Sequence, residues 1–260
     1  AIDNKNLTWN EKIKVSANAS GMGGSQIFLE TNEEMTVEDL FKGIAVASAN
    51  DATVALAERI GGTEESFVAM MNIRAKKLGI KDTLFKNSTG LDEQDHFSTA
   101  YDIAVIAKEL IKHEQVLKFT SIYEDYLRAD TDSKFWLVNT NKLVRFYQGV
   151  DGLKTGYTTD AGYCLTATSL KNNMRLIAVI LGEKESSVRN DEITKMLDYG
   201  YNQYNVEQLI SKNTNLGKIK IDRASEKYID IVPMEDIKVL YKKGEQKKKI
   251  SYDIKIFKVK

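Results

Sequence analysis

Cysteine, histidine and proline are scarce in this chain of 260 residues. The single cysteine, Cys164, has no partner for an internal disulfide, and the two histidines, His96 and His113, are too few for a histidine-based metal site without help from carboxylates. The only proline is Pro233. We therefore expect no internal disulfide, no metal and no cofactor.

A charge excess of one sign and a long hydrophobic run are also absent. The 37 basic and 37 acidic residues cancel, so the overall charge gives no indication of nucleic acid as a partner. No stretch approaches the roughly 20 apolar residues of a membrane span, and the start of the chain lacks the charged and then apolar pattern of a signal peptide. We expect contact with a membrane only through a segment outside this chain.

The middle of the sequence is mainly helical in pattern. Thr36, with Asp39 in the capping-box position, predicts a helix from residue 36 to about residue 60. Thr63 predicts the start of a second helix that Gly79 ends, and Thr99 predicts the start of a third. The residues of the third helix that we expect to be buried are Ile103, Ile106, Ala107, Leu110 and Ile111.

From Val150 the pattern changes to strands. Strands are predicted at residues 153–157, 163–168 and 174–181, and consecutive strands of this kind form an antiparallel sheet. A helix over about 187–204 follows and is expected to cover that sheet. Its expected inward residues are Ile193, Met196, Leu197, Tyr201 and Tyr204.

The last part of the chain reads as short strands, with alternation at residues 218–221 and 250–256. We therefore predict a large domain over residues 1–205 and a small β-rich domain over residues 206–260. The chain stops inside a strand-like run, so we expect the small domain to be incomplete.

Two short motifs carry candidate chemistry. In Ser48-Ala49-Asn50, the two polar side chains would point roughly 200° apart on an uninterrupted helix, so they address one site only if the helix breaks between them. The alternative is two polar residues on a continuous helix. In Lys154-Thr155-Gly156, Lys154 and Gly156 share one face of a predicted strand, and the glycine lets a ligand backbone approach closely. The alternative is a tripeptide at the entry of a turn.

Four stretches that include these motifs follow one another in order and together carry a family resemblance. The sequence is similar to the D-alanyl-D-alanine carboxypeptidases of the low-molecular-mass penicillin-binding protein group (peptidase family S11-like) from about Gly21 to Tyr204. The four stretches are residues 43–52 (GIAVASANDA), 87–92 (NSTGLD), 98–104 (STAYDIA) and 152–158 (GLKTGYT). The resemblance implies an α/β (α+β) fold, with a β-lactamase/transpeptidase-like antiparallel sheet flanked by helices.

The resemblance also implies roles for particular residues. Ser48, Asn50 and Lys154 would be catalytic: the serine relays protons to and from the leaving group, the asparagine holds a peptide group of the substrate, and the lysine polarises the site. The implied substrate-binding residues are Thr155, Gly156 and Arg189. A guanidinium and a hydroxyl are suited to a terminal carboxylate. The alternative for Arg189 is a solvated residue at a helix start, and Tyr157 stands where the family often has histidine.

One element of the family pattern is missing. In that family the nucleophile and base belong to a Ser-x-x-Lys motif, and no Ser-x-x-Lys occurs in this sequence. We therefore expect that the N-terminal part of the core, with the nucleophile, precedes Ala1 in a longer protein, and that this chain alone is inactive. The nearest approximation, Thr83-Leu84-Phe85-Lys86, is not expected to supply a nucleophile.

The resemblance implies a serine-type D-Ala-D-Ala carboxypeptidase that trims the terminal D-alanine of peptidoglycan stem peptides through an acyl-enzyme, binds β-lactams and acts outside the cytoplasm at the cell envelope. Two alternatives remain open: a non-catalytic peptidoglycan-binding protein, and a class A-type β-lactamase. Arg189 and the trailing β-rich unit favour the carboxypeptidase over the β-lactamase.

Overall fold

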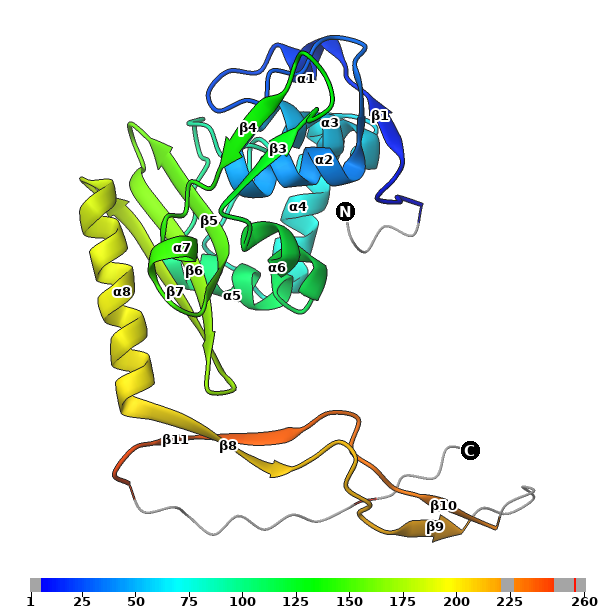
Figure 1. Cartoon of the computed structure of the whole chain (residues 1–260), viewed down its shortest axis with the longest axis vertical. Helices are drawn as coiled ribbons and strands as arrows, with labels where there is room; N and C mark the ends of the chain where they lie inside the picture. The colour runs from blue at the N-terminus through cyan, green and yellow to red at the C-terminus, as the bar shows by residue number, and fades with distance from the viewer. Residues whose placement is uncertain (1–5, 221–226, 246–254, 256–260) are drawn as a thin grey trace. The chain divides into compact units, whose positions relative to one another are not determined.

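The computed structural model describes residues 6–220, 227–245 and 255 (Figure 1). The chain divides into two compact units. The first contains the residues up to Lys171 together with Arg175–Asp198, and the second contains Asn172–Met174 and the residues from Tyr199 onward. The domain assignments 1–205 and 206–260 stay a prediction.

The helical part of the first unit begins its main helices where the sequence predicts. The hydroxyls of Thr36, Thr63 and Thr99 each accept a hydrogen bond from the backbone N–H three residues later, which satisfies one of the free donors at a helix start. The helices are α1 (Ala17–Ser20), α2 (Val37–Lys42), α3 (Asn50–Gly61), α4 (Glu64–Lys77), α5 (Ala100–Leu110), α6 (Glu114–Thr120) and α7 (Leu143–Phe146), with a π-helical turn η1 (Gly43–Ala47) between α2 and α3.

The predicted three-stranded sheet is confirmed. It consists of β5 (Val150–Thr158), β6 (Gly162–Lys171) and β7 (Met174–Glu183) in that order, and β5 pairs with β6 in antiparallel register. Asn172 and Asn173 form the turn into β7 with positive φ angles of 51° and 60°, a conformation that asparagine tolerates better than most residues. Helices α6 and α7 contact β5, and α5 contacts β6.

The helix predicted after the sheet is α8 (Ser186–Gln203), which follows β7 and runs beside the sheet (Figure 1). Ile193 and Leu197, one helical turn apart, are fully buried as expected. The expectation for Met196 was wrong: its side chain is 45% exposed, because it is rotated about 100° away from Leu197 around the helix.

The largest hydrophobic core lies around α2 and α3. Two antiparallel strand pairs that the sequence did not predict contribute to it: β1 (Lys12–Lys14) with β2 (Glu34–Thr36), and β3 (Glu124–Leu127) with β4 (Phe135–Val138). Large side chains that are fully buried in this core include Ile27, Leu40, Val46, Val54, Leu127 and Leu137.

The predicted buried face of α5 was partly wrong. Ala107 is buried, but Leu110 is 37% exposed at the last position of the helix, where fewer neighbours cover a side chain.

The described residues of the second unit form two separate strand pairs. These are β8 (Tyr204–Ile210) with β11 (Ile237–Lys242), and β9 (Lys218–Lys220) with β10 (Tyr228–Asp230), both antiparallel. The strand predicted at 218–221 is β9, apart from residue 221, which lies outside the described residues. The predicted strand at 250–256 also lies outside them, except for Lys255.

Candidate active site

The helix that carries Ser48 and Asn50 is broken between those residues. The π-helical turn η1 ends at Ser48, whose φ of 64° is left-handed, and α3 begins afresh at Asn50. The N–H of Ala49 donates to the carbonyl of Gly43 at 3.2 Å, which closes the wide turn. The alternative of two polar residues on a continuous helix is therefore wrong.

Asn50 joins this break to the preceding segment of chain. Its side-chain Nδ2 donates to the carbonyl of Gly23 at 2.8 Å, and its backbone N–H donates to the carbonyl of Ser25 at 2.8 Å. Gly24 has a φ of +77°, and a Cβ there would lie 2.7 Å from Asn50 Nδ2. The close approach that holds the amide of Asn50 thus requires a glycine at this position.

Asp51, which the sequence analysis missed, anchors the same region from inside the core. Its carboxylate is almost fully buried and accepts hydrogen bonds from the backbone N–H groups of Ile27, Leu29 and Ala52. The only sequence feature that could have indicated this role is the position of the aspartate directly after Ser-x-Asn. That position does not distinguish a buried, anchoring carboxylate from an ordinary acidic residue in the first turn of a helix.

Lys154 connects the helix break to the sheet. It lies in β5, and its Nζ donates to Ser48 Oγ at 2.6 Å and to the carbonyl of Thr155 at 2.6 Å. Burial, with the nearby positive charge of Arg189 as a second cause, lowers the pKa of Lys154 to about 8. The fold therefore brings together two motifs that are 106 residues apart.

Thr155 and Gly156 continue the same strand. Thr155 Oγ1 donates to Thr140 Oγ1 at 2.7 Å, and Gly156 pairs with Cys164 on β6. Because Lys-Thr-Gly lies well inside β5, the alternative of a turn-entry tripeptide is wrong.

Arg189 lies in the first turn of α8 and is only 5% exposed. Its Nη1 donates to the carbonyl of Cys164 at 3.4 Å, and its Nε and Nη2 donate to Asn190 Oδ1 at 3.2 and 2.9 Å. Burial lowers the pKa of Arg189. The alternative of a solvated helix-start arginine is therefore wrong, and the guanidinium contacts β6, the strand that pairs with Lys-Thr-Gly.

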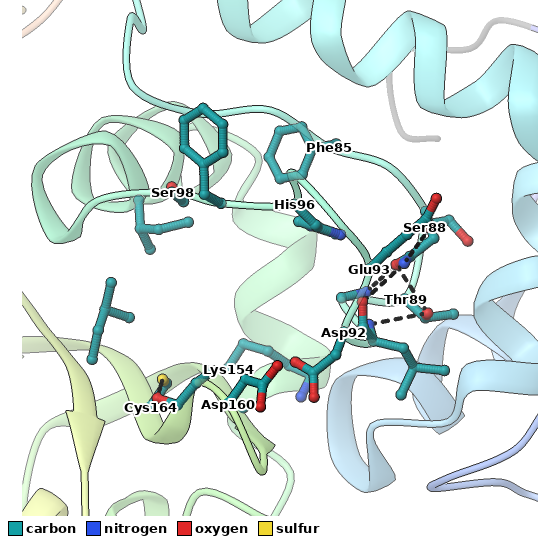
Figure 2. Close-up of a pocket in the computed structure, with 18 of the residues that line it drawn as sticks. Phe85, Ser88, Thr89, Asp92, Glu93, His96, Ser98, Lys154, Asp160 and Cys164 are labelled. Carbon is teal, nitrogen blue, oxygen red and sulfur yellow. Dashed lines mark hydrogen bonds between the residues drawn. The ribbon is translucent and has the colours of Figure 1, made fainter.

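A cavity of about 1010 Å³ opens beside β5 (Figure 2). Lys154, Thr155 and Gly156 line it, whereas Ser48, Asn50 and Arg189 are not among its lining residues. The other lining residues include Phe85, Ser88, Thr89, Asp92, His96 and Phe97.

Two further residues of this cavity are Cys164 and His96. Cys164 lines the cavity because it is the cross-strand partner of Gly156 and so projects from the same face of the sheet. His96 lies in a loop and is half-buried, and its Nδ1 has no hydrogen-bond partner among the described residues. Burial lowers the pKa of His96, and the charges of Glu93 and Asp92 oppose that effect.

Metal ligands and membrane helices are not evident within the described residues. These residues contain no cluster of three or more histidine, cysteine, aspartate or glutamate side chains suited to a metal ion. None of the helices in the described ranges is both long enough and apolar enough to cross a membrane.

The chain is similar to known proteins in both sequence and structure. The chain is 52% identical over 256 residues to the D-alanyl-D-alanine carboxypeptidase DacF of Bacillus subtilis (98% of this chain, 66% of the relative) and 33% identical to DacD of Escherichia coli (94% and 64%). It thus spans slightly less than two thirds of each. The crystal structure of penicillin binding protein 5 from Haemophilus influenzae superposes with a TM-score of 0.79 at 30% identity, covering 95% of this chain and 72% of that one.

The mixed α/β fold, with its antiparallel sheet and flanking helices, is therefore the fold of penicillin-binding proteins. Residues 1–185 match the peptidase S11 family, described as D-alanyl-D-alanine carboxypeptidase. Since that match covers most of the sequence, the chain belongs to the D-alanyl-D-alanine carboxypeptidase family.

Proposed function

We propose that this chain forms most of a serine-type D-Ala-D-Ala carboxypeptidase, which removes the terminal D-alanine from peptidoglycan stem peptides. The observation that carries the proposal is the 2.6 Å hydrogen bond from Lys154 Nζ to Ser48 Oγ, in a chain of this family. The bond joins the proposed proton relay to a cation beside the cavity. The substrate lies outside the cytoplasmic membrane, so the enzyme would act at the cell envelope.

The proposed binding of the substrate begins at its C-terminal carboxylate. Thr155 lies on β5, and the guanidinium of Arg189 contacts β6 at the carbonyl of Cys164. A carboxylate is best recognised by a guanidinium together with neutral donors. Arg189 has five N–H donors and makes three hydrogen bonds within the described part of the chain, so two N–H groups remain for a ligand. Recognition of this carboxylate is what distinguishes a carboxypeptidase from an endopeptidase.

Ser48 and Asn50 would then act on the scissile peptide group. Asn50 Nδ2 is engaged by Gly23, which leaves the side-chain carbonyl Oδ1 as the acceptor for a substrate N–H. Ser48 Oγ accepts a hydrogen bond from Lys154 Nζ, so the hydroxyl proton of Ser48 is free to point elsewhere. Ser48 can therefore pass that proton to the departing amine of D-alanine. Gly156 lets the substrate backbone approach the edge of β5 without a side chain in the way.

The acyl-enzyme step requires a nucleophile that these 260 residues do not contain, since no Ser-x-x-Lys occurs among them. We propose that such a motif is encoded upstream of Ala1, that β-lactams acylate its serine, and that residues 1–260 alone are inactive. The attacking serine would form an ester with the penultimate D-alanine and release the terminal one, and water would then hydrolyse the ester.

Covalent labelling with a fluorescent penicillin tests this proposal. The chain as given and a form extended upstream through its own reading frame are compared, with heat-denatured protein as the control for non-specific labelling. We expect stable labelling of the extended form alone, together with release of D-alanine from a peptide ending in D-Ala-D-Ala.

Each alternative has its own outcome in this experiment. Rapid turnover of the penicillin without D-alanine release would identify a β-lactamase. A folded extended form that neither labels nor releases D-alanine would contradict catalysis and favour a peptidoglycan-binding protein.

A further inference from the structure

A short polar segment, Asn139-Thr140-Asn141, crosses between the two motif-bearing elements. It connects β4 to α7 and has no counterpart among the residues for which the sequence suggested a role. The backbone N–H of Thr140 donates to the carbonyl of Val46 at 3.1 Å, two residues before Ser48. On the other side, Thr140 Oγ1 accepts the hydroxyl proton of Thr155 at 2.7 Å. One residue therefore contacts both the Ser48 turn and the Lys-Thr-Gly strand.

The two asparagines hold this segment rigidly. Both side chains are fully buried. Asn139 Nδ2 donates to the carbonyls of Thr120 and Ile122, at 3.1 and 2.7 Å, and Asn139 Oδ1 accepts from the N–H of Asn141 at 2.8 Å. Buried amides with satisfied donors and acceptors are costly to displace, so the position of Thr140 is set by the fold.

Asn141 extends the same bracing to β5. Its Nδ2 donates to the carbonyl of Gly152 at 3.1 Å, and its Oδ1 accepts from the N–H of Leu143 at 3.2 Å. Gly152 lies two residues before Lys154, so the segment that holds Thr140 also fixes the strand that carries Lys154 and Thr155.

The hydroxyl of Thr140 can either accept a hydrogen bond from Thr155 or donate one to it. A threonine hydroxyl has one proton to donate and two lone pairs that accept. In the structure Thr155 gives its proton to Thr140. A carboxylate can only accept, so Thr155 can bind one only if its proton turns outward. Thr140 can then rotate its own hydroxyl and donate to Thr155, which keeps the hydroxyl of Thr155 in place and polarises it.

We propose that Thr140 is a positioning residue that holds the Thr155 hydroxyl for the C-terminal carboxylate of the substrate. The inference rests on the proposed carboxypeptidase function, because it requires that Thr155 meets a carboxylate. Thr140 itself need not touch the substrate. It contributes to the preference for a free carboxylate over an uncharged terminus.

The test uses the enzyme as its gene encodes it, with Thr140→Val as the isosteric variant that lacks the hydroxyl. Thr140→Ser keeps the hydroxyl, and Thr214→Val changes an exposed threonine of the second unit as the control. The substrates are a peptide ending in D-Ala-D-Ala and the same peptide with a C-terminal amide. For Thr140→Val we expect KM for the acid to rise about fivefold, as for one lost hydrogen bond, with a smaller change in kcat. The expected change for the amide is smaller still.

Thr140→Ser and Thr214→Val should behave as the wild type. In the Thr155→Val background, Thr140→Val should add little, because its effect acts through the hydroxyl of Thr155. Equal losses for acid and amide, or full additivity of the two threonine changes, would overturn the inference.

Two further outcomes separate the possible failures. If the wild-type enzyme releases no D-alanine from the acid, the proposed function fails rather than the role of Thr140. If Thr140→Val lowers the melting temperature strongly, Thr140→Ala provides a second variant without the hydroxyl and with no added bulk. Unfolding of both variants, with Thr140→Ser intact, would assign Thr140 to stability and contradict a positioning role.

Discussion

At the scale of single residues, the site depends on one buried cation. Lys154 Nζ donates to the side chain of Ser48 and to the backbone carbonyl of Thr155, and an ammonium group has enough donors for both. Within the described part of the chain no carboxylate raises its pKa, so burial and the charge of Arg189 lower the pKa without compensation. The result is a lysine with a pKa of about 8, well below that of an ordinary lysine.

We predict that Lys154 titrates with a midpoint of about 8 in the folded protein. Carbon-13 NMR of labelled lysine side chains measures this, and Lys154→Arg identifies the signal by removing it. In Arg189→Gln the midpoint should move upward, because the charge of Arg189 is one cause of the lowered pKa. A midpoint that stays the same in Arg189→Gln would contradict the coupling between these two groups.

The same pKa fixes the sign of one contribution to stability. An unfolded lysine keeps its proton up to a pH near 10.5, so between pH 8 and 10.5 the unfolded state binds more protons than the folded state. The contribution of Lys154 to the free energy of unfolding therefore rises with pH across that window. Below pH 8 both states are protonated, and the folded state bears the full cost of burying the charge.

The residues that were predictable from sequence are those with a short-range signature. Ser48, Asn50 and Lys154 belong to tripeptides that the family resemblance assigns to one site, and the hydrogen bond from Lys154 to Ser48 agrees with that assignment. Thr140 and Asp51 were not predicted, because a threonine and an aspartate in these settings are common. Their partners come from elements distant in sequence, and only the folded chain brings those together.

At the scale of elements, the start of α3 is the junction on which the site is built. The helix begins at Asn50, two residues after Ser48, and the carboxylate of Asp51 in its first turn accepts hydrogen bonds from the backbone N–H groups of Ile27 and Leu29. That contact holds the segment that also meets Asn50 at Gly23. The buried carboxylate of Asp51 and the break in the helix before Asn50 therefore both fix the position of α3.

We predict that Asp51→Asn lowers the free energy of unfolding by about 3 kcal/mol, because an amide places a donor against backbone donors and loses charge-assisted bonds. Urea unfolding with an unchanged m-value measures this. Asp191→Asn on α8 is the matched control: Asp191 is 61% exposed and pairs with Lys195 at 2.7 Å, so its loss should cost less than about 1 kcal/mol. Similar midpoints for the two variants would show that Asp51 is not an anchor.

Element boundaries followed from the sequence where a local signal exists. The three threonine caps gave the starts of α2, α4 and α5, and two asparagines gave the turn between β6 and β7. The short strands β1 to β4 were not predicted, since three or four residues are too few to display alternation. The exposed side chains of Met196 and Leu110 show the limit of hydrophobic periodicity. The periodicity predicts which side of a helix faces the core, but tertiary packing decides how much of that side is buried.

At the scale of the whole molecule, the two units differ in how they are stabilised. Among the described residues, every buried side chain lies between Ile13 and Leu197, and none belongs to the strand pairs of the second unit. All six proposed site residues also lie in the first unit. Folding and chemistry should therefore be properties of the first unit.

We predict that ending the chain after Gln203, which keeps α8 complete, leaves the melting temperature within about 3 °C of the parent, since the described residues beyond it bury no apolar core. Thermal unfolding of otherwise identical proteins measures this. The matched control ends after Glu185 and removes α8 with the buried Ile193 and Leu197, each of which should cost about 2 to 5 kcal/mol when lost. That control should unfold. A large loss of stability in the first truncation would mean that the second unit stabilises the first. It would contradict the inference that folding is a property of the first unit alone.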